Sequence, residues 1–419
     1  MPGELRILRQ HIQVLHVAYT RFPADTRVKR ETAALRAAGY QVAVIALRGR
    51  GERAVERQDG VVVIRVPGRK SRGSVLSYLA EYGAFLWRCR RLIATHRAFL
   101  GARIVHVHTL PDFLLWSALP AQRRGARVIF DMHEILPEFT ASKLPPATAK
   151  LAARLAAVIE RWARGRADLT ITVNRPIEEL LASRPARRSE RRLVLHNTAD
   201  PADFGEMAEP SQVTGGPNIV YHGTLTALYG VDLAIRAIAE VRRNAVPAQL
   251  TIIGDGPERS ALQRLAARLG VTDAIEFVMP MPQAALPAIL RHAAAGVVPT
   301  RLDGMTRYSL STKLLEYVHL GIPVLAARLP SYQRYLDEDA LWYWTPGDVQ
   351  DLAHALIKVV AAAPAERARR AARARAAITP FAWAREQRRL VAAYADLLAA
   401  AGNCVDSTAA IRSAAAPSP

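Results

Sequence analysis

The sequence has few cysteines and no long hydrophobic run, and each absence excludes a class of protein. Cys89 and Cys404 are the only cysteines among 419 residues. Two separate thiols exclude a disulfide framework and a cysteine-based zinc site, and they are typical of a reducing compartment. No stretch approaches the roughly 18 consecutive apolar residues of a transmembrane helix. Because residues 1–10 also lack the apolar core of a secretory signal, we expect a cytoplasmic protein.

Acidic residues are too few to balance the basic ones. Lys and Arg together number 57 against 37 Asp and Glu, which gives a formal net charge of +20. Such an excess favours anionic partners, whether nucleic acid, anionic lipid or a phosphorylated substrate. A bias toward arginine on solvated faces accounts for the charge equally well. Motifs that pair aromatic and basic residues for nucleic-acid binding are absent, so we expect no nucleic-acid partner.

Short β-rich runs alternate with longer helical patterns along the chain. Most of these runs are continuously apolar, as expected for parallel strands that are buried on both faces. The expected strands are 13–18, 41–47, 61–66, 104–108, 127–131 and 169–173 in the first half, and 219–221, 250–253, 275–278, 296–298 and 324–326 in the second. The β-α-β spacing predicts an α/β protein with doubly wound parallel sheets.

The pattern restarts after an irregular region rich in proline and glycine, residues 197–217. The chain is also too long for a single core. We therefore predict two Rossmann-like domains, 1–198 and 199–376, that face a cleft. A terminal helix, 377–401, is expected to return to the first domain, and the tail 402–419 is expected to be disordered. Ligands of open parallel sheets bind beyond the carboxyl ends of the strands, which is where candidate site residues are expected.

The segment 309–327 reads SLSTKLLEYVHLGIPVLAA and predicts a helix followed by a strand. Glu316 lies one turn into this helix, and its two carboxylate oxygens can accept from both hydroxyls of a ribose diol. Lys313 lies in the first turn, where the helix dipole disfavours a cation, and a bound phosphate could hold it there. A surface glutamate and a solvated lysine are the alternatives that the pattern leaves open.

This segment resembles the signature of retaining glycosyltransferases of family 4, in the subgroup with a K-L-x-E-Y helix followed by G-x-P-V. The resemblance extends from Phe22 to about Tyr394. It implies the GT-B fold, with the first domain on the acceptor side and the second binding a nucleotide-sugar donor. It also implies that Glu316 holds the donor ribose, and we place Lys313 and Leu315 of the same helix among the donor-binding residues.

Two strand-to-helix turns in the second half carry glycine. The first, in IVYHGTLTALYGVD, contains Gly223 and Thr224, and the second, in LTIIGDGPE, contains Gly254 and Asp255. Backbone N–H groups at such turns can bind phosphate, although a glycine there is also what any tight turn needs. The resemblance implies that both turns approach the donor, so all four residues are candidates for donor binding.

The chain departs from the family pattern at two places. Many members carry an Arg after the first turn glycine and a Lys before the next helix, and Thr224 and Tyr229 stand there instead. The diphosphate charge must then be met elsewhere. The candidates from composition are Lys313, Arg301, Arg307 and Arg27, of which we place Lys313 and Arg27 in the donor site. Many family members also have a glutamate eight residues before the ribose-binding one, where it contacts the transferred sugar. Tyr308 stands at that position in this chain, and we transfer no role to it.

In the first half, VIFDMHEILPE places His133 and Glu134 just after the strand that ends at Asp131. Histidine beside glutamate suits proton transfer or a hydrogen bond to a sugar hydroxyl, although a loop histidine without such a role fits too. The resemblance implies that His133 contacts the donor sugar near the reacting carbon, and we assign catalysis to His133 and Glu134. His106 and His108 share one face of a strand, which makes a metal site conceivable. Strand ends often carry histidines without metal, so we expect no metal and no cofactor.

The resemblance implies transfer of a hexose, with retention, from a nucleotide diphosphate sugar to a saccharide or lipid-linked acceptor, in cell-surface polysaccharide or glycolipid synthesis. A nucleotide-sugar epimerase on the same fold and a non-catalytic lipid-binding relative remain as alternatives. The helical region 75–98 mixes Trp and Leu with Arg. This mixture suits either packing on the sheet or contact with an anionic membrane surface at the inner membrane face.

Overall fold

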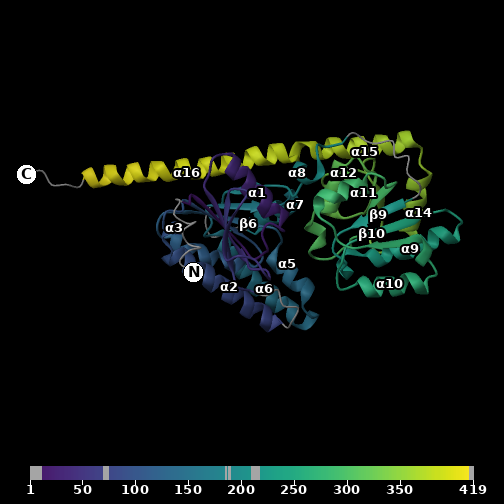
Figure 1. Ribbon diagram of the computed structural model, residues 1–419, viewed down its shortest axis with the longest axis horizontal. Helices are drawn as coiled ribbons and strands as arrows, with labels where there is room; N and C mark the ends of the chain where they lie inside the picture. The colour runs from purple at the N-terminus through teal and green to yellow at the C-terminus, as the bar shows by residue number, and fades with distance from the viewer. Residues whose placement is uncertain (1–11, 69–74, 185, 187–189, 209–217, 415–419) are drawn as a thin grey trace, which may run out of the picture. The chain divides into compact units, whose positions relative to one another are not determined.

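The computed structural model describes residues 12–68, 75–184, 186, 190–208 and 218–414, and the chain divides into two compact units (Figure 1). Unit 1 comprises residues 1–196 and 386–419, and unit 2 comprises residues 197–385. The first division stands close to the predicted boundary after residue 198, and the second falls within the terminal helix. Part of the predicted connecting region, 209–217, lies outside the described residues.

Unit 1 is built on an eight-stranded sheet in the order β3-β4-β2-β1-β5-β6-β7-β8. Every neighbouring pair is parallel except β3 and β4. Every residue of the central strands β1, β2, β4 and β5 is buried, as expected for strands that are covered on both faces. The strands are β1 Val14–Ala18, β2 Val42–Leu47, β3 Val55–Gln58, β4 Val61–Val66, β5 Ile104–His108, β6 Arg127–Met132, β7 Leu169–Thr172 and β8 Arg192–Val194.

Two strands of unit 1 were not predicted from the sequence, because β3 is mostly polar and β8 has only three residues. Strand β3 reads VERQ and pairs with β4 through a tight hairpin. Asp59 and Gly60 form its turn, both with positive φ, as a two-residue Asp-Gly hairpin requires. Strand β8 reads RLV and is only partly buried. Apolar runs therefore identify the centre of this sheet but not its edges.

Helices cover the sheet of unit 1, and the terminal helix α16, Trp383–Ala414, joins them. The Tyr394 hydroxyl lies 2.6 Å from His106 Nδ1, and the Glu386 carboxylate lies 3.1 Å from His196 Nδ1. The helix continues beyond residue 401, where the sequence analysis begins a disordered tail, and residues 415–419 lie outside the described residues. The other helices are α1 Thr26–Ala37, α2 Val75–Thr95, α3 Arg97–Leu100, η2 Asp112–Ala118, α4 Leu119–Gln122, α5 Leu136–Lys143, α6 Pro146–Arg164 and α7 Arg175–Ser183.

Unit 2 repeats the architecture with a six-stranded, fully parallel sheet in the order β11-β10-β9-β12-β13-β14. Its strands are β9 Asn218–His222, β10 Gln249–Ile253, β11 Ile275–Val278, β12 Ala295–Val298, β13 Val324–Ala327 and β14 Trp342–Trp344. Its helices are α8 Pro201–Phe204, η3 Ala227–Tyr229, α9 Val231–Arg243, α10 Arg259–Arg268, η4 Thr272–Ala274, η5 Gln283–Ala285, α11 Leu286–Leu290, η6 Thr306–Tyr308, α12 Thr312–His319, α13 Pro330–Gln333, α14 Val349–Ala361, α15 Pro364–Ile378 and η7 Thr379–Phe381. The predicted fold class, α/β with two doubly wound parallel sheets, is confirmed.

Candidate functional site

In unit 2, two glycine turns meet at the carboxyl ends of adjacent strands. Gly223 follows β9 and Gly254 follows β10, and the Gly223 N–H donates to Ile253 O at 2.9 Å. A Cβ on Gly254 would lie 2.0 Å from the carbonyl oxygen of Gly223, so only glycine lets the turns approach this closely. Thr224 and Asp255 follow these glycines and are exposed. The four predicted turn residues therefore lie together at the edge where parallel sheets bind ligands, with Thr224 and Asp255 exposed.

Helix α12 presents Glu316 beside the end of β9. The Glu316 side chain is mostly buried, and its Oε2 atom lies 3.2 Å from Nε2 of His222, without the alignment of a hydrogen bond. Burial, together with the nearby Lys313 ammonium, lowers the pKa of His222 to about 3. The imidazole is therefore neutral at pH 7, and His222 does not neutralise the Glu316 carboxylate as an imidazolium would.

Lys313 extends from the first turn of α12 toward the Gly223 turn. Its Nζ atom lies 4.1 Å from the ring centre of Tyr229 and 5.5 Å from that of Tyr221. A Cβ on Gly223 would lie 3.2 Å from the same Nζ atom. Burial lowers the pKa of Lys313 to about 8, although the Glu316 carboxylate acts in the opposite direction. Lys313 is therefore mainly a cation at pH 7, held by two aromatic rings above a glycine turn.

Tyr317 fixes the position of α12 against the sheet. Its hydroxyl donates to Val220 O at 3.2 Å and accepts from the backbone N–H of His222 at 3.1 Å. Its ring packs where Gly296 of β12 leaves space, because a Cβ there would lie 2.4 Å from the ring. The tyrosine of the K-L-x-E-Y pattern thus anchors the helix that carries Lys313.

Leu315 and Arg27 are placed differently from the other predicted donor-binding residues. Leu315 is 1% exposed and belongs to the hydrophobic core of unit 2. Arg27 lies in unit 1, where its guanidinium forms two 2.8 Å hydrogen bonds with the Asp131 carboxylate and donates to Leu195 O at 3.0 Å. A phosphate ligand is normally accessible, so this placement indicates a structural role for Arg27 and gives its predicted donor contact no support.

In unit 1, Asp131 at the end of β6 organises His133. Burial alone would raise the pKa of Asp131, but Arg27 and neighbouring imidazoles hold it well below its usual value, so the residue is a carboxylate. Its Oδ2 atom lies 3.2 Å from His133 Nε2, and His108 Nδ1 lies 3.2 Å from the same nitrogen. Burial acts to lower the pKa of His133, but the carboxylate outweighs it and raises the pKa.

His133 is the accessible member of this group, with a side chain that is 21% exposed, whereas Asp131 and His108 are buried. Glu134 follows it and is partly buried. Their assignment to catalysis stays a prediction. Neither His222 nor the anchoring hydroxyl of Tyr317 was predicted from the sequence. A histidine at the end of a strand, directly before a turn glycine, was the available signal for His222.

Comparison with known proteins identifies the class of this architecture. The sequence model of "Glycosyl transferase 4-like domain" matches residues 24–198, and that of "Glycosyl transferases group 1" matches residues 216–362. The chain therefore belongs to the family 4 glycosyltransferases. Sucrose-phosphate synthase from Thermosynechococcus elongatus superposes with a TM-score of 0.75 at 18% identity, over 93% of this chain and 100% of that one. The fold is accordingly GT-B.

Two curated relatives are mannosyltransferases. The GDP-mannose-dependent alpha-(1-6)-phosphatidylinositol monomannoside mannosyltransferase of Mycolicibacterium smegmatis is 35% identical over 133 residues, which is 31% of this chain and 34% of that protein. The corresponding dimannoside enzyme of Mycobacterium tuberculosis is 26% identical over 91% of this chain and 93% of its own length. The chain thus matches about a third of the first relative's length. Within the described residues, none of the helices combines the length and apolarity that crossing a membrane requires.

Proposed function

We propose that this protein transfers a hexose, with retention, from a nucleotide diphosphate sugar to a saccharide or lipid-linked acceptor. The observation that supports this proposal is the meeting of Glu316 and Lys313 with two glycine turns at one end of a parallel sheet. The mannosyltransferases named above are described as GDP-mannose-dependent, and a GT-B structure from Anabaena, HepE, with a TM-score of 0.67 at 15% identity, was solved with UDP-glucose. The donor class is therefore a nucleoside diphosphate sugar, with the base left open.

Each part of the donor has a matching group in unit 2. The Glu316 carboxylate can accept hydrogen bonds from the two ribose hydroxyls. Lys313 supplies a positive charge for the diphosphate, and the backbone of the Gly223 and Gly254 turns supplies N–H donors. Tyr229 stands where many family members have a lysine. Its ring instead holds the Lys313 ammonium at 4.1 Å, so Lys313 compensates for the missing cation.

The transfer step requires no protein nucleophile. In a front-face reaction the leaving diphosphate takes the proton of the acceptor hydroxyl, while the new bond forms on the face that the diphosphate leaves. Lys313 and the backbone N–H groups stabilise the developing negative charge. The contact between His133 and the transferred sugar stays a prediction from the resemblance, and within unit 1 Asp131 orients the imidazole. We propose neither a metal nor a cofactor in this step.

A donor screen tests the function directly. Purified protein is heated with UDP, GDP, ADP or TDP, and the matching nucleotide raises the melting temperature, because ligand at 100 times its Kd stabilises by about 2.7 kcal/mol. Sugar nucleotides of that base are then assayed for released nucleoside diphosphate, and the product's anomeric configuration is determined by NMR. Conversion of donor without acceptor would indicate an epimerase, and the absence of stabilisation by every nucleotide would refute the donor site.

Exposed apolar side chains on unit 1 support a lipid-linked acceptor. Leu151, Leu155 and Val158 are 75%, 62% and 61% exposed and form one stripe of α6. Trp116 of η2 is 41% exposed and packs on Trp162 of α6, and η2 also packs against α2. Helix α2, which packs against η2, exposes Leu79 and Trp87, and we group these with Trp116, Leu151, Leu155 and Val158 as one candidate surface.

We propose that this surface contacts an anionic membrane at the cytoplasmic face, where a lipid-linked acceptor would be reached. Basic residues accompany it, and Arg91 lies 5.5 Å over the Trp87 ring. Apolar side chains beside basic ones suit an anionic interface. The double substitution Leu151→Ser and Leu155→Ser should abolish sedimentation with phosphatidylglycerol vesicles. Leu302→Ser, which changes a half-exposed leucine of unit 2, should not alter binding. Equal binding by all three proteins would exclude the surface.

A further inference from the structure

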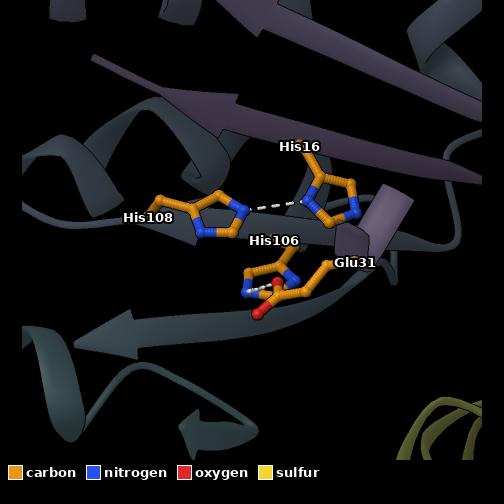
Figure 2. A group of neighbouring side chains, drawn as sticks. All are labelled: His16, Glu31, His106 and His108. Carbon is orange, nitrogen blue, oxygen red and sulfur yellow. Dashed lines mark hydrogen bonds and ion pairs between the residues drawn. The ribbon is translucent and has the colours of Figure 1, made fainter. Parts of the chain in front are cut away.

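Four buried side chains converge inside unit 1. His16 comes from β1, Glu31 from α1, and His106 and His108 from β5, and Figure 2 shows them facing one another. Their exposed fractions are 0%, 0%, 0% and 2%. One ligand atom from each lies within 4.8 Å of those of the other three. Strands β1 and β5 pair in register His16 to His106, which places both imidazoles at the same level of the sheet.

Several polar atoms of this cluster have no hydrogen-bond partner among the described residues. They are His16 Nε2, His106 Nε2 and both carboxylate oxygens of Glu31. On the opposite side, His106 Nδ1 lies 2.6 Å from the Tyr394 hydroxyl. His16 Nδ1 lies 2.9 Å from His108 Nε2, a contact that His108 exchanges for the ion when it binds through this nitrogen. Leaving a buried polar atom unsatisfied lowers stability, so several such atoms side by side indicate a missing partner. Metal-binding histidines are typically fixed in this way through the nitrogen that does not bind the metal.

Two buried carboxylates beside the cluster share one guanidinium. Arg27 forms two 2.8 Å hydrogen bonds with Asp131 and a 3.1 Å contact with Glu31 Oε1. The second oxygen of Glu31, Oε2, lies 3.9 Å from His106 Nε2 and faces the cluster.

We propose that His16, Glu31, His106 and His108 bind one divalent transition metal, of the zinc class, as a structural site in unit 1. Imidazole and carboxylate are suitable ligands for such an ion, at about 2.0–2.2 Å. Two ligands of one ion are therefore at most about 4.4 Å apart. The cluster reaches this spacing with small side-chain shifts. The ion satisfies the unpartnered Nε2 atoms of His16 and His106 and gives Glu31 a second partner beside Arg27. This site revises the sequence-based expectation that the chain holds no metal, and it does not depend on the transfer reaction.

The test measures metal content in the full-length chain without a histidine tag. Protein from zinc-supplemented cultures, dialysed against chelator, is analysed by inductively coupled plasma mass spectrometry. We expect about one equivalent of metal per chain in the wild type and less than a tenth in Glu31→Gln and His106→Gln. His354→Gln, which changes an exposed histidine of α14, should retain the full equivalent. X-ray absorption of the wild-type protein should show a first shell of nitrogen and oxygen with imidazole scattering.

Two results would overturn the proposal. In the first, wild-type protein from zinc-supplemented cultures contains less than a tenth of an equivalent of metal per chain. It also melts at the same temperature as protein from chelator-treated medium. This result would show that a proton takes the place of the ion. Metal that remains in both cluster variants would be bound elsewhere. The absorption spectrum keeps the test decisive if the variants do not fold, because a shell without imidazole in the wild type also excludes the site.

Discussion

Replacing Glu316 with glutamine should separate the contribution of this residue to ligand binding from its contribution to stability. The change keeps the volume of the side chain but removes the charge and one of the two acceptor oxygens. A hydrogen bond to a charged group contributes about 1.5–3 kcal/mol, and the proposed ribose contact has two of them. Loss of about 3–4 kcal/mol corresponds to a fall in kcat/KM of roughly 150-fold to 1000-fold. The melting temperature should change little, because Glu316 lies beside a neutral imidazole and its carboxylate is costly to bury.

The assay compares kcat/KM for the sugar nucleotide, the Kd of the nucleoside diphosphate by calorimetry, and the melting temperature. Glu276→Gln is the matched control, because it makes the same change at an exposed position of β11 in the same unit. We expect Glu276→Gln to behave as the wild type in all three measurements. A Glu316→Gln protein that binds nucleotide normally would refute the ribose contact. A fall of more than about 10 °C in its melting temperature would make Glu316 a structural residue.

Three further predictions concern Lys313, Asp131 and Gly254. Lys313→Met should weaken nucleoside diphosphate binding about 10-fold to 100-fold. The affinity of the wild-type protein should fall as the pH rises through about 8, because Lys313 loses its proton there. Calorimetry should find no such pH dependence in the variant. Asp131→Asn should lower the unfolding free energy by about 3–5 kcal/mol in urea, because it removes the charged partner of two hydrogen bonds from the buried Arg27 guanidinium. Since the folded pKa of Asp131 is depressed, its stabilisation is complete above about pH 4 and is lost as the pH falls toward that pKa. Equal stability of both proteins at pH 7 would contradict this prediction. Gly254→Ala should destabilise unit 2 by about 1–3 kcal/mol, because the new Cβ meets the Gly223 carbonyl, whereas Gly304→Ala, which has open space around it, should not.

The fold could be predicted largely from the sequence because buried parallel strands have a distinct composition. VLHVA, VAVIAL and VVVIRV are almost wholly apolar and are buried at every position. The same criterion missed β3, whose residues VERQ are buried only at the first position, and β14, whose residues WYW follow a turn-rich stretch. Edge strands are recognised by pairing rather than composition, and pairing depends on residues distant in sequence.

The candidate site could be predicted only in part, because the sequence reports residue types and not their partners. Glycine at the ends of β9 and β10 was recognisable as turn chemistry, although the contact between Gly254 and Gly223 depends on adjacent strands. Arg27 illustrates the opposite case. An arginine beside a helix start suggested a phosphate ligand, yet its partner is Asp131, 104 residues further along the chain. A single sequence contains no signal for a pairing over that distance.

The K-L-x-E-Y helix combines two functions that its sequence does not separate. Lys313 and Glu316 are three residues apart and therefore lie on one face of α12, the face toward the glycine turns. Leu315 belongs to the core, and Tyr317 bonds to the backbone of β9 on both sides of Tyr221, whose ring faces the Lys313 ammonium. The residues that face the glycine turns and those that hold the helix thus lie within the same five positions. The spacing of the pattern therefore matters as much as its residue types. A carboxylate at position 315 instead of 316 would point into the hydrophobic core and not toward the glycine turns.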